Sequence, residues 1–443
     1  MNAREVALQV VRDVFVAPGG GTERSAQEAL DYRARKANLS QRDRAFATEL
    51  AYGAIKMRRA LDWYLGPFIG ERRKELPPVI AEILRLAVYE LIYTRADTHA
   101  TVFEFVNLAK RYGHRGVANL VNAVLRSLLR DRPLDPSRDD FENDDEYLGT
   151  RYSLPTWLVR QWRATFGERV ESIAAGVNAP AQTAVTTNAL RTSAAEAIER
   201  FAAQGITATV SGFVPESLLV DDAAAVRAHE ATAGGAWWVQ SESSAMPVAV
   251  LNPQPEEAVL DVCSGRGNKA LQIGARMGGQ GVEVCIEREA RKAKVLEARL
   301  AGAGIVAGVV IGDATRPLLE PNQRFDRALV DAPCSGIGVV GRHPEARWKK
   351  QPGDGERLAL TQRALLEALA PSIHEGGALV YAVCSTDPRE TLEVVEWFRS
   401  KANFERGLIP AAFEPFITEE GDVLVPPGLD GRDGFYIARL EHR

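Results

Sequence analysis

Acidic residues and cysteines end a series of short apolar runs in the second half of this 443-residue chain. The runs read AVLDVCSG, GVEVCIE, VAGVVIGDA, FDRALVDAP and GGALVYAVC. They are rich in β-branched residues and alternate with helical stretches, which is typical of a doubly wound, mostly parallel sheet. Such a sheet binds ligands in a crevice beyond the carboxyl ends of its strands. We therefore expect the residues that end these runs to form one site.

The first run leads into a loop that contains two glycines and precedes a predicted helix. The loop consists of Cys263, Ser264, Gly265, Arg266, Gly267, Asn268 and Lys269. Glycines let the backbone turn sharply and approach a ligand closely. A dinucleotide site uses a similar turn, but the third glycine of that pattern is missing here.

Acidic residues follow the next two runs. Glu287 ends the second run, where a carboxylate can accept both hydroxyls of a ribose, and Asp313 follows the third, where a carboxylate can bind an adenine amino group. Carboxylates spread over successive strands fit S-adenosylmethionine better than a pyrophosphate cofactor. Either residue, taken alone, is equally well explained as a solvated strand end.

Two of the four cysteines follow the fourth and fifth runs. Cys334 and Cys384 lie among Ser, Gly and Pro residues just beyond their strands, where loops carry function, whereas Cys285 within its run is expected to be a buried apolar residue. A redox pair is an alternative, although the two are far apart in sequence without a resolving-cysteine pattern. The chain has no CxxC pair for zinc and too few cysteines for a disulfide framework. We expect a reduced, cytoplasmic protein without a metal site.

The composition and periodicity predict several domains. Residues 1–132 are predicted to be all helical, residues 133–152 an acidic linker, residues 153–232 a small α+β subdomain, and residues 233–443 the α/β domain. No stretch approaches the ~18 uninterrupted apolar residues of a membrane helix. The N-terminal apolar pattern contains acidic residues, which indicates a helix rather than a signal peptide.

The charge is distributed unevenly along the chain. The net charge is −5, but residues 1–132 hold 22 Lys and Arg against 15 Asp and Glu. A basic helical part on an acidic body is the arrangement expected when one part contacts phosphates. The candidate contacts are two clusters, one with Arg33, Arg35, Lys36, Arg42 and Arg44 and one at residues 72–74. The alternative is an ordinary solvated helical surface.

Four motifs of the second half occur together in a known family. They are DAPCSGIGVVGRHPEARW at 331–348, YAVCSTDPRE at 381–390, QSESS at 240–244 and DGFYIA at 433–438. Through them, residues 235–443 resemble the Nop/Sun family of RNA cytosine-C5 methyltransferases, which have a Rossmann-like domain. The N-terminal part resembles the NusB-like RNA-binding fold through DRAFATELAYG at 43–53, LRLAVYEL at 84–91 and NLVNAVLR at 119–126.

The pairing of these two parts is similar to bacterial small-subunit ribosomal RNA methyltransferases of the Fmu/Sun type. The resemblance implies a ferredoxin-like fold for residues 153–232, S-adenosylmethionine as cofactor, and 16S rRNA as partner. The family usually has Cys-Ala-Ala-Pro-Gly-Gly-Lys in its first loop, where this chain has Arg266 and Asn268 in place of a Pro and a Gly. Asn tolerates positive φ better than most residues, so we expect the turn to be kept.

The resemblance also implies roles for individual residues. Carbon 5 of cytosine is too weak a nucleophile unaided, so a thiolate first adds to C6. Following the family, Cys384 is the nucleophile and Cys334 assists release. Asp331 would hold the cytosine edge and border the cofactor, and Lys269 would stabilise the charges nearby. The target base must be single-stranded or flipped out to be reached.

Three other functions remain open from the sequence. The same chemistry could act on tRNA or another RNA. An RNA-binding or assembly factor could have lost the cofactor through its altered loop. A transcription antitermination factor would rest on the N-terminal fold alone and would leave the cysteines unexplained.

Overall fold

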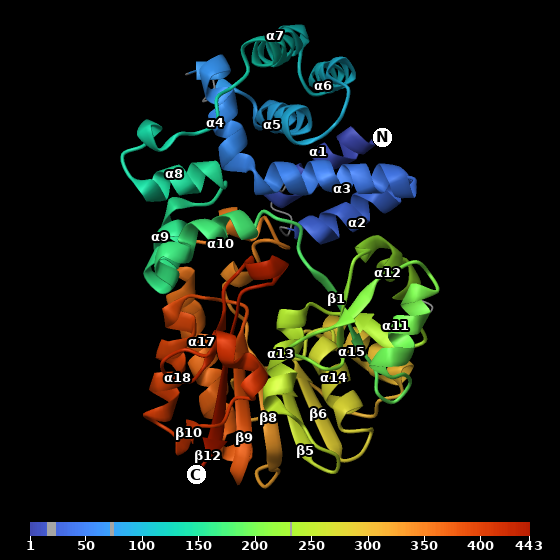
Figure 1. The fold of residues 1–443 in the computed structure, drawn as a ribbon, viewed down its shortest axis with the longest axis vertical. Coiled ribbons are helices and arrows are strands. Elements are labelled where there is room, and N and C mark those ends of the chain that lie inside the picture. Colours follow the sequence, from blue (N-terminus) through green and yellow to red (C-terminus); the bar gives the residue numbers. More distant parts are fainter. Residues whose placement is uncertain (16–23, 71–74, 231–232) are drawn as a thin grey trace. The chain divides into compact units, whose positions relative to one another are not determined.

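The computed structural model describes residues 1–15, 24–70, 75–230 and 233–443. The chain divides into two compact units (Figure 1). Unit 1 comprises Met1–Asn178 together with His343–Lys349, and unit 2 comprises Ala179–Arg342 together with Lys350–Arg443. A short segment from the second half of the sequence therefore belongs to the N-terminal unit.

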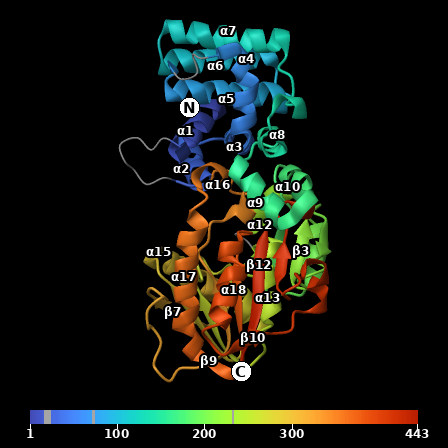
Figure 2. The same ribbon diagram turned by 90° about the vertical axis from the view of Figure 1, so that its left-hand side faces the viewer.

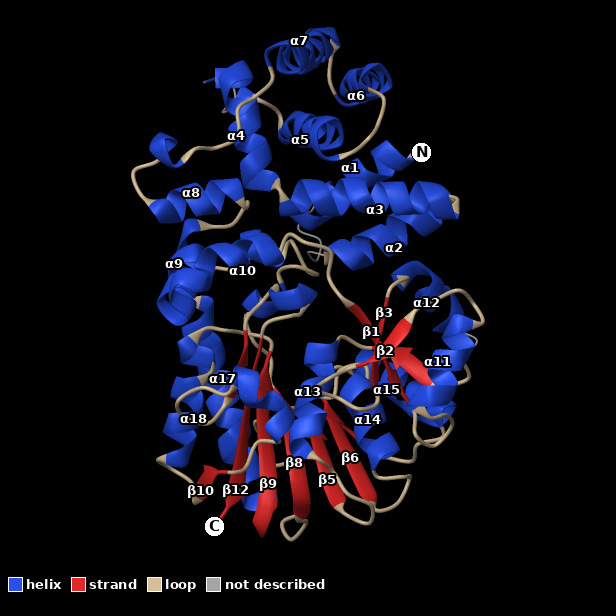
Figure 3. Cartoon of the chain, viewed as in Figure 1, coloured by secondary structure: helices blue, strands red, loops and turns tan. Residues whose placement is uncertain are grey.

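The regular structure described in unit 1 is helical (Figure 3), as the sequence predicts for residues 1–132. The helices are α1 (Ala3–Phe15), α2 (Ala26–Ala37), α3 (Gln41–Lys56), α4 (Arg58–Ile69), α5 (Pro78–Tyr93), α6 (Thr98–Tyr112), α7 (Arg115–Asp131), η2 (Arg138–Asp140), α8 (Asp144–Arg151), α9 (Thr156–Phe166), η3 (Gly167–Arg169), α10 (Val170–Gly176) and the inserted α16 (Ala346–Lys349). The apolar faces of α1 to α7 form one core around fully buried residues such as Val10, Leu50 and Phe105.

Part of the acidic segment expected as a linker is helical. Asn143 caps α8 by accepting a hydrogen bond from the Glu146 backbone N–H, and Leu148 of α8 is buried. Acidic side chains in a first turn favour a helix because they face the positive end of its dipole. The run of Asp and Glu residues thus starts a helix here, and the expected domain limits at 132, 152 and 232 remain predictions.

Unit 2 begins with a small four-stranded antiparallel sheet in the order β2-β3-β1-β4. Its elements are β1 (Thr183–Thr187), α11 (Ala194–Ala202), β2 (Ala208–Val210), β3 (Ser217–Val220), α12 (Ala223–Glu230) and β4 (Trp237–Val239). The fourth strand follows residue 232, so the small sheet extends past the predicted boundary of this subdomain.

The larger sheet of unit 2 has the order β10-β12-β9-β8-β5-β6-β7, and most of its strands lie side by side in this order in Figure 1. Strands β5 to β9 are parallel, and β12 is antiparallel to β9 and β10. The elements are α13 (Glu242–Leu251), β5 (Ala258–Val262), α14 (Asn268–Arg276), β6 (Val282–Glu287), α15 (Ala290–Ala303), β7 (Gly308–Ile311), β8 (Phe325–Asp331), η4 (Ile337–Val339), α17 (Asp354–Leu369), η5 (Ala370–Ser372), β9 (Ile373–Val383), η6 (Pro388–Glu390), α18 (Leu392–Arg399), β10 (Phe404–Arg406), η7 (Ala411–Phe416), β11 (Val423–Val425), η8 (Leu429–Gly431) and β12 (Phe435–His442).

Both faces of this sheet are covered by helices. Successive residues of a strand point to opposite faces, so each strand contributes apolar side chains to both. On one face Leu260, Val330 and Tyr381 pack with α17 and α18, which are neighbours in Figures 1 and 2. On the other face Val259 and Leu329 pack with α13. The five apolar runs recognised in the sequence are β5 to β9, and their carboxyl ends meet at one edge of the sheet.

Candidate active site

A cavity of about 350 Å³ lies at the carboxyl ends of these strands, and we call it the thiol cavity. The predicted site residues that border it are Cys263, Gly265, Glu287, Asp313, Asp331, Cys334 and Cys384. They come from the ends of β5, β6, β7, β8 and β9. The expectation that these strand-end residues share one crevice therefore agrees with the structure.

A cavity of about 290 Å³, the loop cavity, shares Cys263, Gly265 and Asp331 with the thiol cavity. Its border also includes the predicted residues Ser264, Arg266, Asn268 and Lys269, and the unpredicted residues Ser244, Asp261 and Arg299. The Lys269 ammonium donates to Asp331 Oδ2 at 2.7 Å and to Ser244 Oγ at 3.1 Å. This ion pair is largely shielded on the lysine side, because the Lys269 side chain is only 8% exposed.

Three residues of the loop between β5 and α14 have a left-handed backbone conformation. They are Cys263, Gly265 and Gly267, with φ of 62°, 61° and 90°. The turn is kept, as expected, but the expected reason is wrong, because Asn268 begins the helix and does not have a positive φ. Gly267 borders neither cavity and acts as the N-cap of α14.

An arginine from a neighbouring helix holds this altered loop. One Arg299 nitrogen of α15 donates to the Arg266 carbonyl at 2.8 Å and to Asn268 Oδ1 at 2.7 Å. Asn268, which stands where the family usually has glycine, thus supplies an acceptor that fixes the loop to α15. The loop keeps a defined conformation despite its departure from the usual sequence.

Glu287 and Asp313 are bound to the backbone around them. Glu287 accepts from the Gly265 N–H at 2.8 Å and from the Glu289 N–H at 2.7 Å, which ties the end of β6 to the glycine loop. Asp313 accepts from the backbone and hydroxyl of Thr315, and the hydroxyl hydrogen bond lowers the pKa of Asp313. Both carboxyl groups border the thiol cavity rather than open solvent alone.

Asp261 was not singled out from the sequence as a site residue. It is fully buried within β5, and neither of its carboxylate oxygens has a hydrogen-bond partner among the described residues. Burial raises the pKa of Asp261 to about 7. An unpartnered buried carboxylate is costly, which points to a ligand group that completes this site when it is bound.

The two loop cysteines face each other. Cys334 Sγ and Cys384 Sγ are 3.2 Å apart, close enough for a hydrogen bond between thiols. That hydrogen bond and burial raise the pKa of Cys334 well above its ordinary value. Cys334 thus keeps its proton and can donate it toward the Cys384 sulfur. Cys285 is buried in β6, as expected for an apolar residue.

Hydrogen bonds join three of the sequence motifs to one another. Ser243 donates to the Asp433 carbonyl at 2.8 Å, and Arg342 pairs with the Asp433 carboxylate. Gln240 donates to Gln272 of α14 and accepts from Trp238. The motifs at 240–244, 331–348 and 433–438 are therefore connected by hydrogen bonds within unit 2.

Some of the basic residues proposed as phosphate contacts are already paired with carboxylates, and others are exposed. Arg33 binds Asp13 with two hydrogen bonds, and Arg44 pairs with Asp31 at 2.5 Å. Arg35, Lys36 and Arg42 are exposed on α2 and α3. The cluster at residues 72–74 lies outside the described residues. Among the described residues of the two clusters, Arg35, Lys36 and Arg42 thus remain as candidate phosphate contacts.

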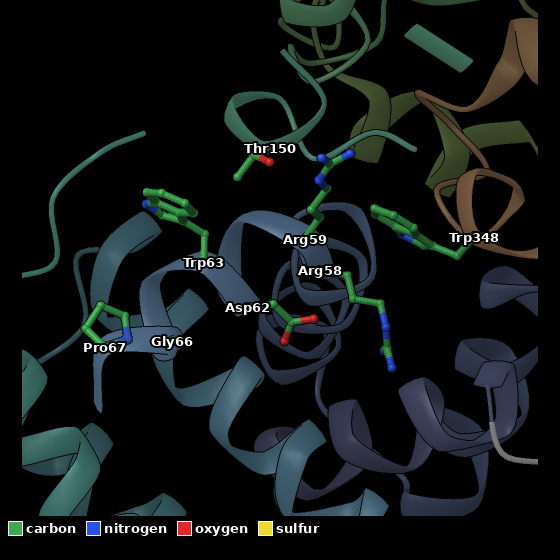
Figure 4. A pocket seen from close by; sticks show the side chains of 8 residues that line it. All are labelled: Arg58, Arg59, Asp62, Trp63, Gly66, Pro67, Thr150 and Trp348. Carbon is green, nitrogen blue, oxygen red and sulfur yellow. The ribbon is translucent and has the colours of Figure 1, made fainter. Parts of the chain in front are cut away.

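Unit 1 contains a cavity of about 560 Å³ on α4 (Figure 4). Trp63 and Trp348 lie at two sides of it with Arg59 between them, and Thr150 completes the rim. Arg59 donates to the Leu154 carbonyl and to Thr156, while Arg58 is paired with Glu82. The cavity offers aromatic rings more than available charge.

Comparisons with known proteins agree with this architecture. A family model described as 16S rRNA methyltransferase RsmB/F matches residues 248–441, a NusB family model matches residues 1–130, and an RsmF/B-like ferredoxin-like domain matches residues 154–227. A probable ribosomal RNA small subunit methyltransferase B of Bacillus subtilis is 34% identical, covering 91% of this chain and 92% of its own. The chain belongs to the 16S rRNA methyltransferase RsmB/F family.

A second relative of this family supports the assignment along the whole chain. The ribosomal RNA small subunit methyltransferase B of Thermus thermophilus is 35% identical over 94% of this chain and 93% of its own. The family resemblance inferred from the motifs is thus confirmed. So is the fold class, with a NusB-like domain, a ferredoxin-like domain and a Rossmann-like methyltransferase domain.

Solved structures share the fold. The crystal structure of PH0851 has a TM-score of 0.82 and 22% identity, and it covers 100% of this chain and 99% of its own. The structure of NSun6 from Pyrococcus horikoshii with SFG has a TM-score of 0.58 and 18% identity over 65% of this chain and 98% of its own. The two likenesses extend the fold assignment from the family models to solved structures.

Two further searches concern the described residues only. None of their helices is long and apolar enough to cross a membrane. They also contain no cluster of three His, Cys, Asp or Glu residues suited to a metal ion.

Proposed function

We propose that this protein methylates carbon 5 of a cytosine in 16S rRNA, using S-adenosylmethionine, in the cytoplasm. The observation that carries the proposal is the pair of thiols of Cys334 and Cys384, 3.2 Å apart on the border of a cavity that also reaches Glu287 and Asp313. A nucleophile and a proton donor thus adjoin a place for a nucleoside. Membership of an rRNA methyltransferase family supports the choice of RNA as substrate.

The donor set at the two cavities fits S-adenosylmethionine. Glu287 would accept the ribose hydroxyls, and Asp313 would accept from the adenine amino group. The buried Asp261 carboxylate lacks a partner among the described residues and borders the loop cavity, so it would hold the ammonium group of the methionine part. The loop residues Cys263, Ser264, Gly265, Arg266, Asn268 and Lys269 would form the wall around the bound cofactor, while Gly267 would support this wall as the N-cap of α14. When bound, the cofactor supplies an electrophilic methyl group.

The residues of this chain would carry out the covalent part of the reaction. The Cys384 thiolate forms a bond to C6 of cytosine, and the electron pair of the C5–C6 double bond makes C5 nucleophilic. After methylation, a base removes the C5 proton, and the returning electron pair expels Cys384 as thiolate. Cys334 keeps its proton next to Cys384 and so suits the step in which the leaving sulfur is stabilised.

Asp331 and Lys269 would position the base. Asp331 lies at the end of β8 and is partly exposed to both cavities, so its carboxylate can accept from the amino edge of cytosine. Lys269 holds one oxygen of Asp331 at 2.7 Å and leaves the other for the base. The ion pair thus fixes the orientation of the Asp331 carboxylate beside the base.

The proposal is tested by analysing the modified nucleoside. Purified protein is incubated with 16S rRNA and S-adenosylmethionine, and the RNA is digested and examined for 5-methylcytidine by mass spectrometry. Bisulfite sequencing of rRNA from a deletion strain locates the affected cytosine. Methylation of a different atom, or of tRNA in preference to rRNA, would contradict the proposal.

A further inference from the structure

We propose that Glu390 is a positioning residue that sets the separation of the Cys334 and Cys384 thiols. The proposal rests on the proposed function for its meaning in catalysis, but its geometric part stands without it. Glu390 ends η6 and is fully buried, beneath the two loops that carry the cysteines. It borders neither cavity and so does not touch the substrate directly.

Each cysteine is followed by a serine, and Glu390 binds both serines. Its Oε1 accepts from the Ser335 backbone N–H at 2.8 Å. Its Oε2 accepts from the hydroxyls of Ser335 and Ser385, the second at 2.6 Å. The two serine hydroxyls are also 3.0 Å from each other. One carboxylate therefore joins the residue after Cys334 to the residue after Cys384.

A glutamine of α17 completes the arrangement. Gln362 is fully buried, and its amide nitrogen donates to Glu390 Oε1 at 3.1 Å and to the Pro333 carbonyl at 3.0 Å. Pro333 precedes Cys334, so the Cys334 loop is held on both sides of the cysteine. The tyrosine hydroxyl of Tyr381 donates to the Glu390 carbonyl at 2.6 Å, which fixes the η6 backbone.

The chemistry of the four donors requires a carboxylate. A carboxylate is an acceptor only and can take several hydrogen bonds at once, whereas an amide presents two donor hydrogens on one side. Glu390 receives one backbone N–H, two hydroxyls and one amide N–H, all from neutral groups. Removing it leaves several buried donors without partners, which frees the two loops to separate.

The test measures how readily the two thiols form a disulfide in glutathione buffers. Two protein thiols are oxidised to the disulfide while oxidised glutathione is reduced to two glutathione thiols. The equilibrium constant gives the effective concentration of one thiol at the other, and peptide mass spectrometry identifies the linked pair. This readout needs neither RNA nor S-adenosylmethionine, so it is independent of the proposed function.

We expect Glu390→Ala to lower the effective concentration at least tenfold, which corresponds to a shift of about 30 mV in the potential of the pair. Its methyl transfer should lose kcat with little change in the KM for RNA. Glu393→Ala is the matched control, because Glu393 is exposed three residues later and should leave both values unchanged. The Ser335→Ala/Ser385→Ala double variant removes the two hydroxyl hydrogen bonds to Glu390 and keeps the Ser335 N–H bond, so it disturbs the fold less. It decides the test if Glu390→Ala does not fold.

Three results would overturn the proposal. One is an effective concentration within twofold of wild type in a folded Glu390→Ala or double-serine protein. A second is the absence of a Cys334–Cys384 disulfide in the wild type under oxidising buffers. The third is an equal loss in Glu393→Ala. By contrast, a weakened disulfide together with methylation of an atom other than cytosine C5 would contradict the proposed function and leave the positioning role intact.

Discussion

Cys334 and Cys384 carry the same functional group in different surroundings, and this difference separates their roles. The hydrogen bond to Cys384 and burial raise the pKa of Cys334 and so keep the proton on Cys334, which suits it to donate to the sulfur of Cys384. The two roles therefore differ because the two sulfur atoms have different surroundings. This difference gives two substitutions with different expected products.

Replacing Cys384 by alanine should abolish methyl transfer, because no other thiolate can add to C6 in its place. S-adenosylmethionine affinity should stay within a few-fold of wild type, since the expected cofactor contacts come from other strands. Isothermal titration and transfer of a labelled methyl group measure the two properties. Substantial turnover by the variant would show that Cys384 is not the nucleophile.

Replacing Cys334 by alanine should give a different product. Cys384 can still add to the base and the methyl group can still be transferred, but elimination should stall without the neighbouring thiol. A covalent protein–RNA adduct should then accumulate as a slowly migrating band on a denaturing gel. If Cys384→Ala forms this band and Cys334→Ala does not, the two roles are reversed.

Asp261→Asn should make the stability of the protein less dependent on pH. Burial raises the folded-state pKa of Asp261 to about 7, above its value in the unfolded chain, so the folded protein retains a proton that the unfolded chain releases. Wild-type stability contributed by this group is present below about pH 4 and is lost as the pH rises to about 7. Denaturation midpoints should be measured for both proteins at about pH 5 and pH 8. From the lower to the higher pH, the variant should gain stability relative to wild type by an amount on the order of a few kcal/mol.

The same variant should bind S-adenosylmethionine more weakly at about pH 8, because it lacks the carboxylate expected to hold the ammonium group. Parallel stability curves for the two proteins across this pH range would mean that Asp261 titrates normally. Unchanged cofactor affinity would remove Asp261 from the binding site. The stability measurement thus reports the effect of burying the Asp261 carboxyl group, and the affinity measurement reports its part in cofactor binding.

At the scale of elements, the turn from β5 into α14 depends on glycine at one position. Gly267 has φ of 90°, and a Cβ there would lie 2.5 Å from Leu296 Cδ1. Gly267→Ala should therefore cost about 1–3 kcal/mol and should weaken cofactor binding by displacing the loop. Chemical denaturation and cofactor titration measure both effects.

Gly302→Ala is the control for this substitution. Gly302 lies in α15, and a Cβ added there would meet no atom of the described residues within 4 Å, so alanine should stabilise that helix by about 0.5–1 kcal/mol. Equal effects of the two alanines would show that the left-handed turn is not what requires Gly267. Both changes add the same methyl group, so a difference between them reports the left-handed backbone of Gly267 together with its close approach to Leu296.

The elements that form the site were largely predictable from the sequence, whereas the contacts between them were not. The apolar runs located β5 to β9, and the topology of a parallel sheet then placed Glu287, Asp313 and Cys384 at one edge. Glu390 and Gln362 escaped notice because their partners lie in other loops, and no local pattern records such pairing. Arg299 was missed for the same reason, since it binds Asn268 from a separate helix.

At the scale of the whole molecule, RNA affinity should depend on exposed cations of unit 1. Each phosphate contact with a single strand contributes roughly 0.7 to the slope of log affinity against log salt. The Arg35→Gln/Arg42→Gln variant removes two exposed charges and should reduce the slope by up to about 1.4. Filter binding of 16S rRNA at several salt concentrations measures it.

The Lys294→Gln/Lys401→Gln variant removes two exposed charges from unit 2 and serves as the control. If both double variants reduce the slope equally, the effect reflects net charge rather than a surface of the NusB-like domain. Arg33 and Arg44 are left unchanged in this design because they form ion pairs with Asp13 and Asp31. Replacing either arginine would break its ion pair, so a loss of stability could be mistaken for a loss of RNA binding.

The segment His343–Lys349 affects the order in which the protein can be built. Arg347 is buried against the Val177 and Ser153 carbonyls, Trp348 donates to the Ile55 carbonyl, and Glu345 accepts from the Ala26 N–H. A ribosome synthesises all of Ala179–Arg342 before these side chains exist. The N-terminal unit therefore completes its folding late in translation, after the strands that carry Asp261, Glu287 and Asp331 have already emerged.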